Sequence, residues 1–230
     1  MRTTNSILRR ALAGTGIAII SAGVASGVVA CGGGSKTLTT VPGPTPPTGP
    51  APPPIPNLQA ELLTPSDMPA GWSVDKSPSD ATSRPSCLKN LDAQLHTGEI
   101  SRAEAKYQGG SNSIPHLDET LAFYGHGVAT GKLAIFDQTI SRCGQVTFSS
   151  GGNTFTGTIG AMSFPAVGDE SYAYQMNLST KANGLNVTIG FDVVVARKGD
   201  TAFDLALTDL GTPDLSQFRG LVTKALAKLS

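Results

Sequence analysis

The sequence predicts an α+β fold, in which an antiparallel sheet with a meander in its C-terminal half is covered by two main helices. Three observations lead to this prediction. Apolar residues alternate along several short segments that are separated by turn residues. The end of the chain has the apolar spacing of an amphipathic helix. The predicted strands follow one another in runs, with the helices set apart from them. In a parallel sheet, strands and helices would instead alternate along the chain.

Residues 1–30 have the features of a secretory signal peptide. Arg2, Arg9 and Arg10 precede an uncharged run from Ala11 to Ala30. A positive start, an apolar run and small residues before a cleavage site are typical of such signals. Outside these thirty residues the chain has 14 basic and 17 acidic residues, a net charge of −3. That balance gives no electrostatic reason to expect a nucleic-acid partner.

The signal ends in Val28-Val29-Ala30-Cys31, which resembles the lipobox of bacterial lipoproteins. In that family the cysteine is diacylated and the chain is cut just before it. The resemblance implies that Cys31 carries lipid and holds the protein at the outer face of the cell membrane. The alternative is an uncleaved helix, because twenty apolar residues can just span ~30 Å of hydrocarbon. Both alternatives place the rest of the chain outside the cytoplasm.

Residues 31–57 are predicted to be a tether that follows the lipidated cysteine. Prolines dominate the segment: Pro42, Pro44, Pro46, Pro47, Pro50, Pro52, Pro53, Pro54 and Pro56. Proline fixes φ and removes backbone donors, so this segment is expected to be extended. The tether is either a plain spacer or a stalk whose threonines carry sugars. Residues 58–230 then form a single globular domain.

The N-terminal half of this domain is expected to hold two strands, a helix and a third strand. Charged and smaller residues alternate over 102–107, which predicts a strand with one solvated face. A second alternation covers 117–123. Helical spacing of apolar residues predicts a helix over 127–143, and alternation marks another strand at 155–159.

The C-terminal half is expected to be an antiparallel meander. Apolar residues alternate over 172–178, 187–195 and 203–207. Asn183-Gly184 is a favoured two-residue hairpin turn, and Lys198-Gly199-Asp200 turns the chain again. These strands are expected to share one strongly apolar face.

The end of the chain predicts a helix that covers this face. Thr212 is expected to be the cap, Pro213 the first helical residue, and Asp214 an acid at the positive end of the helix dipole. The apolar stripe is Leu215, Phe218, Val222, Ala225 and Leu229. The other face of the central strand carries small and mixed residues around Gly190. That face is expected to leave room for a ligand, or to be filled by the helix at 127–143.

Cys87 and Cys143 are the two cysteines that remain, an even number in an exported chain. We expect them to form a disulfide. The alternatives are a redox pair or a soft metal site. Neither is favoured, because the sequence has no CxxC motif and two cysteines alone make a poor zinc site.

No catalytic motif is present, so the sequence predicts neither an enzyme nor a cofactor. His116, Asp118 and His126 could form a metal site, but we favour the alternative that the two histidines are solvated loop residues. Asp169 and Glu170 follow Gly168, and a turn is favoured over an acid/base pair. Trp72 is expected to pack at the edge of the domain, the alternative being that it lines a ligand site.

The chain also resembles two groups of proteins. The stretch from Leu62 to Trp72, the cysteine at the predicted helix end and the pattern from Asp192 to Asp200 look like actinobacterial envelope lipoproteins. They are also similar to the extracellular sensor domain of mycobacterial serine/threonine kinases of the PknH type. The resemblance implies an antiparallel sheet with helices and a cleft for a ligand. That family's sensor carries two disulfides, whereas this chain has cysteines for one.

Two functional hypotheses follow. The first is a non-enzymatic, sensor-like binding module for a small or lipidic envelope molecule. The second is an interaction or scaffold lipoprotein that docks another envelope protein and has no ligand pocket. A lined apolar cavity would favour the first, and a flat exposed apolar patch would favour the second.

Overall fold

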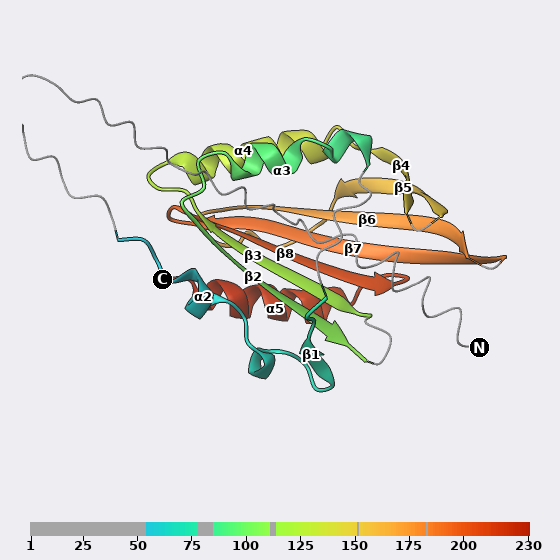
Figure 1. Cartoon of the computed structure of the whole chain (residues 1–230), viewed down its shortest axis with the longest axis horizontal. Coiled ribbons are helices and arrows are strands. Elements are labelled where there is room, and N and C mark those ends of the chain that lie inside the picture. Colours follow the sequence, from blue (N-terminus) through green and yellow to red (C-terminus); the bar gives the residue numbers. More distant parts are fainter. Residues whose placement is uncertain (1–53, 78–84, 111–113, 151, 183) are drawn as a thin grey trace, which may run out of the picture. The chain divides into compact units, whose positions relative to one another are not determined.

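An antiparallel sheet forms the middle layer of the domain (Figure 1). The computed structural model describes residues 54–77, 85–110, 114–150, 152–182 and 184–230. The signal, Cys31 and nearly all of the tether lie outside the described residues. Within the described ranges the sheet has eight strands in the order β1-β2-β3-β8-β7-β6-β5-β4. The strands are β1 Trp72–Val74, β2 Ser101–Gly109, β3 His116–Phe123, β4 Gln145–Ser150, β5 Asn153–Ala161, β6 Glu170–Ala182, β7 Leu185–Lys198 and β8 Thr201–Leu210.

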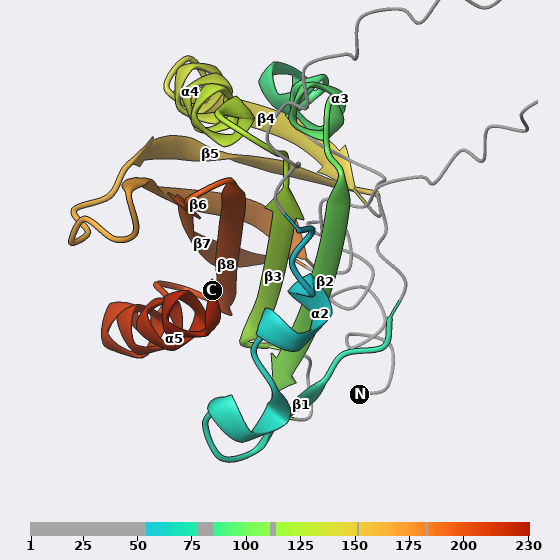
Figure 2. The ribbon, with the colours of Figure 1, turned by 90° about the vertical axis from the view of Figure 1, so that its left-hand side faces the viewer.

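Helices cover both faces of this sheet (Figures 1 and 2). Helices α3 and α4 lie on one face, while α2 and α5 lie on the other. Their bounds are α2 Leu58–Glu61, α3 Leu91–His96, α4 Val128–Ile140 and α5 Leu215–Lys228, with short 3-10 turns η1 at Pro65–Asp67 and η2 at Ser86–Leu88. The predicted α+β class with an antiparallel sheet is therefore confirmed.

The predicted strands and both main helices are present, but four short elements were missed. These are α2, α3, β1 and β4, of which the longest two have six residues. Helix α4 also ends at Ile140, earlier than predicted, and Cys143 lies beyond it in the turn that leads to β4. Elements this short carry too few apolar repeats to be recognised by periodicity.

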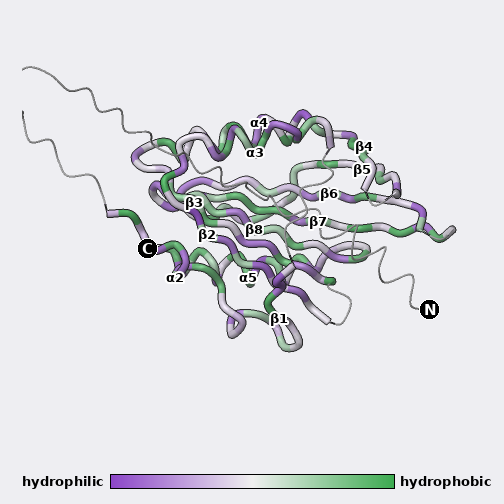
Figure 3. Tube along the Cα trace, viewed as in Figure 1, coloured by the Kyte–Doolittle hydropathy of each residue, from purple (hydrophilic) through white to green (hydrophobic). Residues whose placement is uncertain are grey.

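The meander has two apolar faces, so the prediction of one was wrong. The register pairs Val194 of β7 with Leu205 of β8, which puts these two side chains on the α5 side. The row that contains Phe191, Val193 and Val195 points to the opposite face. Figure 3 accordingly shows hydrophobic stretches along β7, which is covered on both sides.

The space that the sequence suggested beside Gly190 is filled by the chain that leads into α5. A Cβ at Gly190 would lie 2.3 Å from the carbonyl oxygen of Gly211 and 2.5 Å from Cδ of Pro213. This chain leaves no room for a ligand beside Gly190, and the helix at 127–143 lies on the other face of the sheet. Neither expectation for this space holds, because the last helix, not α4, lies on the side of the small residues.

Helix α5 is capped by Asp214 and not by Thr212. The Asp214 carboxylate accepts hydrogen bonds from the backbone N–H groups of Ser216 and Gln217, at 2.9 and 3.1 Å. A carboxylate in this position satisfies free donors and favours the helix dipole. The predicted apolar stripe packs on the sheet, with Phe218 and Val222 fully buried.

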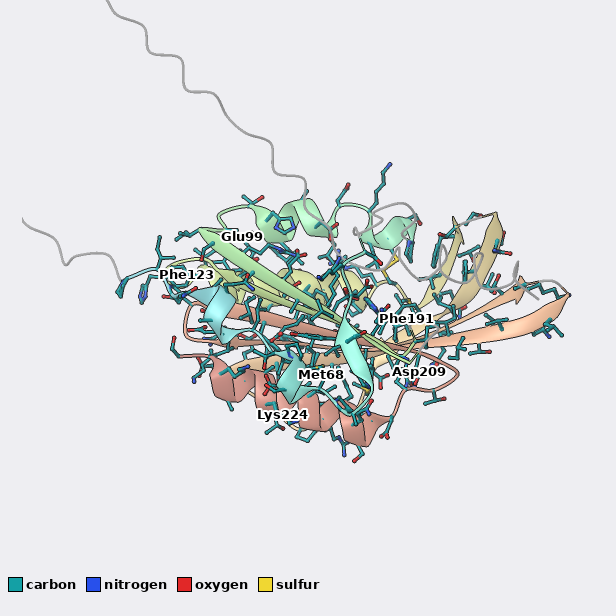
Figure 4. All side chains as sticks on the ribbon, turned by 60° about the horizontal axis from the view of Figure 1, so that its bottom comes forward. Met68, Glu99, Phe123, Phe191, Asp209 and Lys224 are labelled. Atoms are coloured by element: carbon teal, nitrogen blue, oxygen red, sulfur yellow. A yellow bond between two sulfur atoms is a disulfide. The ribbon has the colours of Figure 1, made fainter. Side chains whose placement is uncertain are left out.

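The segment that precedes β1 is held against the sheet and α5 by polar contacts. The Leu63 N–H donates to the buried Glu119 carboxylate at 2.8 Å, and the Tyr107 hydroxyl donates to the Leu63 carbonyl at 2.5 Å. Lys228 of α5 forms an ion pair with Asp67 at 2.6 Å. Met68 and Lys224 of this region are labelled in Figure 4. Burial raises the pKa of Glu119 to about 7.

Candidate functional site

An apolar pocket of about 140 Å³ lies between the sheet and the layer formed by η2, α3 and α4. It is partly open to solvent. Its floor is built from strands β3 to β8, and its roof from the two helices and the segment that holds Cys87. A cavity of this size is large enough for a ring the size of benzene.

The floor follows two rows of side chains that cross the sheet. The first row runs from β3 to β6 through Asp118, Ala206, Val193 and Tyr174. The second row runs from β8 to β5 through Thr208, Phe191, Met176 and Ile159. The floor is therefore polar where it lies on β3 and β8, and it becomes apolar toward β5.

The roof is almost wholly apolar. Its side chains are Leu88, Leu91, Phe136 and Ile140, with Phe148 of β4 closing one end. Phe136 also packs against Tyr174, with ring centroids 6.0 Å apart. These contacts make the roof and the apolar part of the floor one continuous surface.

A disulfide holds this roof in place. Cys87 is bonded to Cys143, as predicted, with Cα atoms 5.8 Å apart (Figure 4). It ties η2 to the turn after α4 across a sequence separation of 56 residues. Closing a loop of that length stabilises the fold by about 4 kcal/mol in the chain-entropy model. Because Leu88 directly follows Cys87, the bond also fixes one wall of the pocket.

Hydrogen bonds join α3 and α4 to each other and to the chain around the sheet. The Tyr124 hydroxyl donates to the Leu95 carbonyl at 2.7 Å, and the Lys132 ammonium donates to the Gln94 carbonyl at 2.5 Å. The Tyr174 hydroxyl donates to the Asp137 carboxylate of α4. The pocket is thus framed by fixed secondary structure on both sides.

Three polar side chains face the pocket from the β3–β8 part of the floor. They are Asp118, Asp204 and Thr208. Thr208 is 1% exposed, and its hydroxyl has no hydrogen-bond partner in the described structure. Oδ1 of Asp118 is likewise buried without a partner. Buried polar atoms without partners are costly, so their presence here needs an explanation.

Burial controls the ionisation of Asp204. Burial raises the pKa of this carboxyl to about 7. The positive charge of Arg102 lowers the pKa, and the negative charge of Asp118 raises it further. Since 3.8 is the ordinary value, the folded domain binds this proton more tightly than the unfolded chain does. Asp204 therefore contributes stability that is fully present below about pH 4 and is lost as the pH rises through 7.

His116 lies between two carboxylates at the edge of this region. Its Nε2 is 3.2 Å from Asp118 Oδ2, and its Nδ1 is 3.6 Å from Asp75 Oδ2. Burial lowers the pKa of His116, but the hydrogen bond and charge of Asp118 outweigh it, so the net shift is upward. His116 therefore engages one oxygen of Asp118, and the other oxygen, Oδ1, is buried without a partner.

A smaller cavity of about 60 Å³ continues from the pocket toward the far end of α4. The two share Phe136 and Asp204. Basic side chains line the smaller cavity, among them Arg102 and Lys132. Arg102 is engaged with Glu104 at 2.7 Å and with Glu99 at 3.6 Å.

The structure does not bring the weighed metal ligands together. His126 lies at the opposite end of β3 from His116, is 99% exposed, and is 3.8 Å from Asp200. In the described ranges, no cluster of three or more histidine, cysteine, aspartate or glutamate side chains is arranged to hold a metal ion.

The turn at Gly168 has the expected positive φ of 64°. Asp169 and Glu170 both form ion pairs with Arg197, at 3.2 and 3.1 Å. The Asp169 carboxylate caps the backbone N–H of Gly199 rather than its own turn.

Trp72 lies on the edge strand β1 and packs against the core on the α5 side, as expected. It is not part of the pocket lining.

Sequence patterns do not identify most of the residues that line the pocket. They indicate Asp118 only as a possible metal ligand, and they do not indicate Asp204 or Thr208. The signal was present in the alternation of β8, where Asp204, Ala206 and Thr208 fall opposite the apolar row of Phe203, Leu205 and Leu207. Such a row looks like a solvated strand face until the register shows that α4 covers it.

The fold is similar to a known extracellular domain. Among the solved structures that it matches is the crystal structure of the extracellular domain of PknH from Mycobacterium tuberculosis, with a TM-score of 0.53 and 12% sequence identity. The match covers 78% of this chain and 98% of that chain. At this identity the similarity concerns the fold. No protein-family model matches the chain, and no curated protein matches it significantly.

The described part of the chain holds no helix with the length and apolar character needed to cross a membrane.

Substitution of two charged neighbours should shift the pKa of Asp204 in opposite directions. Asp118→Asn removes a negative charge and should lower the pKa of Asp204 from about 7, whereas Arg102→Met removes a positive charge and should raise it. Carbon-13 NMR of the Asp204 carboxyl across pH 4 to 9 measures both. Shifts in the same direction, or a wild-type midpoint near 3.8, would contradict the assigned surroundings.

Proposed function

We propose that the chain is a lipid-anchored, extracytoplasmic binding module that holds a small apolar or lipid-like molecule in the pocket beneath α3 and α4. The observation that carries the proposal is the pocket itself. Its lining is mostly aliphatic and aromatic, and its few polar groups are Asp118, Asp204 and Thr208 on β3 and β8 and Asp92 on α3. Sites for small molecules commonly combine an apolar concave surface with a small number of placed polar groups.

The surroundings of the pocket support binding by a largely preformed site. Its floor is a hydrogen-bonded sheet, and its roof is fixed by a disulfide and by hydrogen bonds from Tyr124 and Lys132. A rigid site loses little conformational entropy when a ligand enters, which favours affinity. The proposal treats this module as non-enzymatic, because the lining is chiefly aliphatic and aromatic.

Three features support a location outside the cytoplasm. The N-terminal sequence has a charged start, an apolar run and the lipobox-like ending at Cys31. Disulfides such as Cys87–Cys143 persist mainly in oxidising compartments. The fold is similar to a domain described as extracellular in PknH. We propose on this basis a sensor-like role at the membrane surface, with the membrane reached through the lipid on Cys31.

The other hypothesis, docking of an envelope protein without a ligand pocket, has less support. The large exposed apolar side chains among the described residues are Ile55, Val74, Ile100, Val128, Leu185 and Leu210. They belong to different elements, whereas the pocket gathers its apolar side chains at one place. A protein partner remains compatible with the ligand-binding role.

Filling the pocket should abolish binding of a neutral apolar probe. In Ala206→Leu the larger side chain occupies the centre of the floor, between Asp118 and Val193. Benzene should bind at least roughly tenfold more weakly, a difference of about 1.4 kcal/mol. The full-length chain carrying Cys31→Ala, which avoids lipidation, is titrated by calorimetry.

The matched control is Ala206→Ser, which keeps the volume of the pocket and should bind the probe as the parent does. Circular dichroism verifies that both variants are folded. Equal binding by Ala206→Leu and Ala206→Ser would show that the pocket is not the binding site.

The lipid anchor is tested separately. In cells that export the protein, Cys31→Ala should leave the precursor uncut and without diacylglycerol, because the thiol is the acceptor in lipoproteins. Intact-protein mass spectrometry of the membrane fraction measures both. Cleavage of the variant before residue 31 would mean that the lipobox interpretation is wrong.

A further inference from the structure

Tyr174 of β6 lies at the boundary between the pocket and a second cavity. The pocket has a volume of about 140 Å³. The second cavity measures about 270 Å³ and is more open to solvent. Within the described ranges, Tyr174 is the one residue that lines both. Its side chain is buried, with 7% of the residue exposed, so it stands between the two spaces and not at the surface.

The second cavity is built around the loop that joins β5 to β6. This loop spans 162–169 and is fixed by the backbone of β6. The Met162 N–H donates to the Ala173 carbonyl at 2.9 Å, and the Val167 N–H donates to the Ser171 hydroxyl at 3.0 Å. Apolar side chains line most of the cavity, among them Met162, Phe164, Pro165 and Val194. The cavity could therefore bury apolar atoms if the pocket opened into it.

The side chain of Tyr174 reaches from the sheet to α4. Its hydroxyl donates to the Asp137 carboxylate of that helix. Its ring packs against Phe136, with ring centroids 6.0 Å apart. Phe136 lines the pocket, whereas Asp137 lines the second cavity. Tyr174 thus joins the floor to the roof and forms a wall between the two cavities. Because this wall is held both at β6 and at α4, it has little freedom to move aside.

This wall limits the buried space that a ligand can use. A cavity of about 140 Å³ accommodates a ring the size of benzene. Toward β5 and β6 the pocket ends at Tyr174. Toward the far end of α4 it continues only into the smaller cavity of about 60 Å³, which is too small for a second ring. Apolar atoms beyond one ring would stay in water, where they add little affinity.

We propose that Tyr174 determines the size class of the ligand, and that the pocket selects a compact apolar group of about one ring over fused rings and long acyl chains. This inference rests on the proposed function and adds a specificity-determining residue to it. A shorter side chain at this position would join the two cavities into one larger site. The size preference would then change without any substitution in the rest of the lining.

The test compares benzene with naphthalene, which has a second fused ring. Both are titrated into the full-length chain carrying Cys31→Ala, benzene by calorimetry and naphthalene by its own fluorescence. In this parent chain naphthalene should bind no more tightly than benzene. In Tyr174→Ala it should bind at least roughly tenfold more tightly than benzene, because its second ring is buried in the joined cavity.

The matched control is Tyr174→Phe, which keeps the ring and loses only the hydroxyl that binds Asp137. It should keep the size preference of the parent chain. Tyr174→Leu provides a second shortened variant if Tyr174→Ala does not fold, because a leucine side chain is also too short to reach α4. A substitution that merely destabilised the domain would weaken the binding of both probes and leave the ratio of their affinities unchanged.

The outcomes separate the two proposals. If benzene does not bind the parent chain, or if Ala206→Leu binds it equally well, the pocket is not a ligand site and the proposed function fails. If benzene binds in the pocket but naphthalene binds the parent chain more tightly, the size limit is wrong. If the shortened variants keep the affinity ratio of Tyr174→Phe, Tyr174 is not the wall that sets this limit.

Discussion

The pairing of β8 with its two neighbours is the constraint on which the layers depend. Val194 is opposite Leu205 and Asp118 is opposite Ala206, so each strand directs one row to α5 and the other to α4. A shift of one residue would reverse the rows of β8 and bring Asp204 and Thr208 against α5. Because both faces of the central strands carry apolar side chains, both need a covering layer. The pocket lies where the second layer, α3 and α4, covers a floor that is only partly apolar.

Polar groups with an unpartnered atom lie on both faces of the sheet. On the α5 side, Glu119 accepts the Leu63 N–H and Asp192 accepts from the Gln175 side chain at 3.1 Å, so both carboxylates connect parts of the fold, while the second oxygen of each is buried without a partner. On the α4 side, the Thr208 hydroxyl and one oxygen of Asp118 are buried without a partner, and both residues line the pocket. Buried groups without partners reduce stability on either face. The α4 side differs in holding the apolar pocket, and it is therefore the side to which we assign ligand binding.

The sequence was sufficient to predict the α+β class, the long strands and helix α5, because these have strong periodicity over many residues. The Cys87–Cys143 disulfide was predictable because these are the two cysteines that remain besides Cys31, an even number in an exported chain. The short elements α3 and β4 could not be recognised, and they supply Leu91 and Phe148 to the pocket. The register was also not predictable, and without it Asp204 and Thr208 could not be placed beside Val193 and Phe191. The site depends on contacts between strands and helices far apart in the chain, which periodicity does not report.

The central claim is that the pocket beneath α3 and α4 holds an apolar molecule in the cell. The most direct measurement compares organic extracts of the full-length protein and of Ala206→Leu, both purified from cells that export them, by mass spectrometry. The account predicts an apolar molecule that is present in near-stoichiometric amount in the wild-type extract and is depleted in the variant. Identical extracts from the two proteins would contradict it.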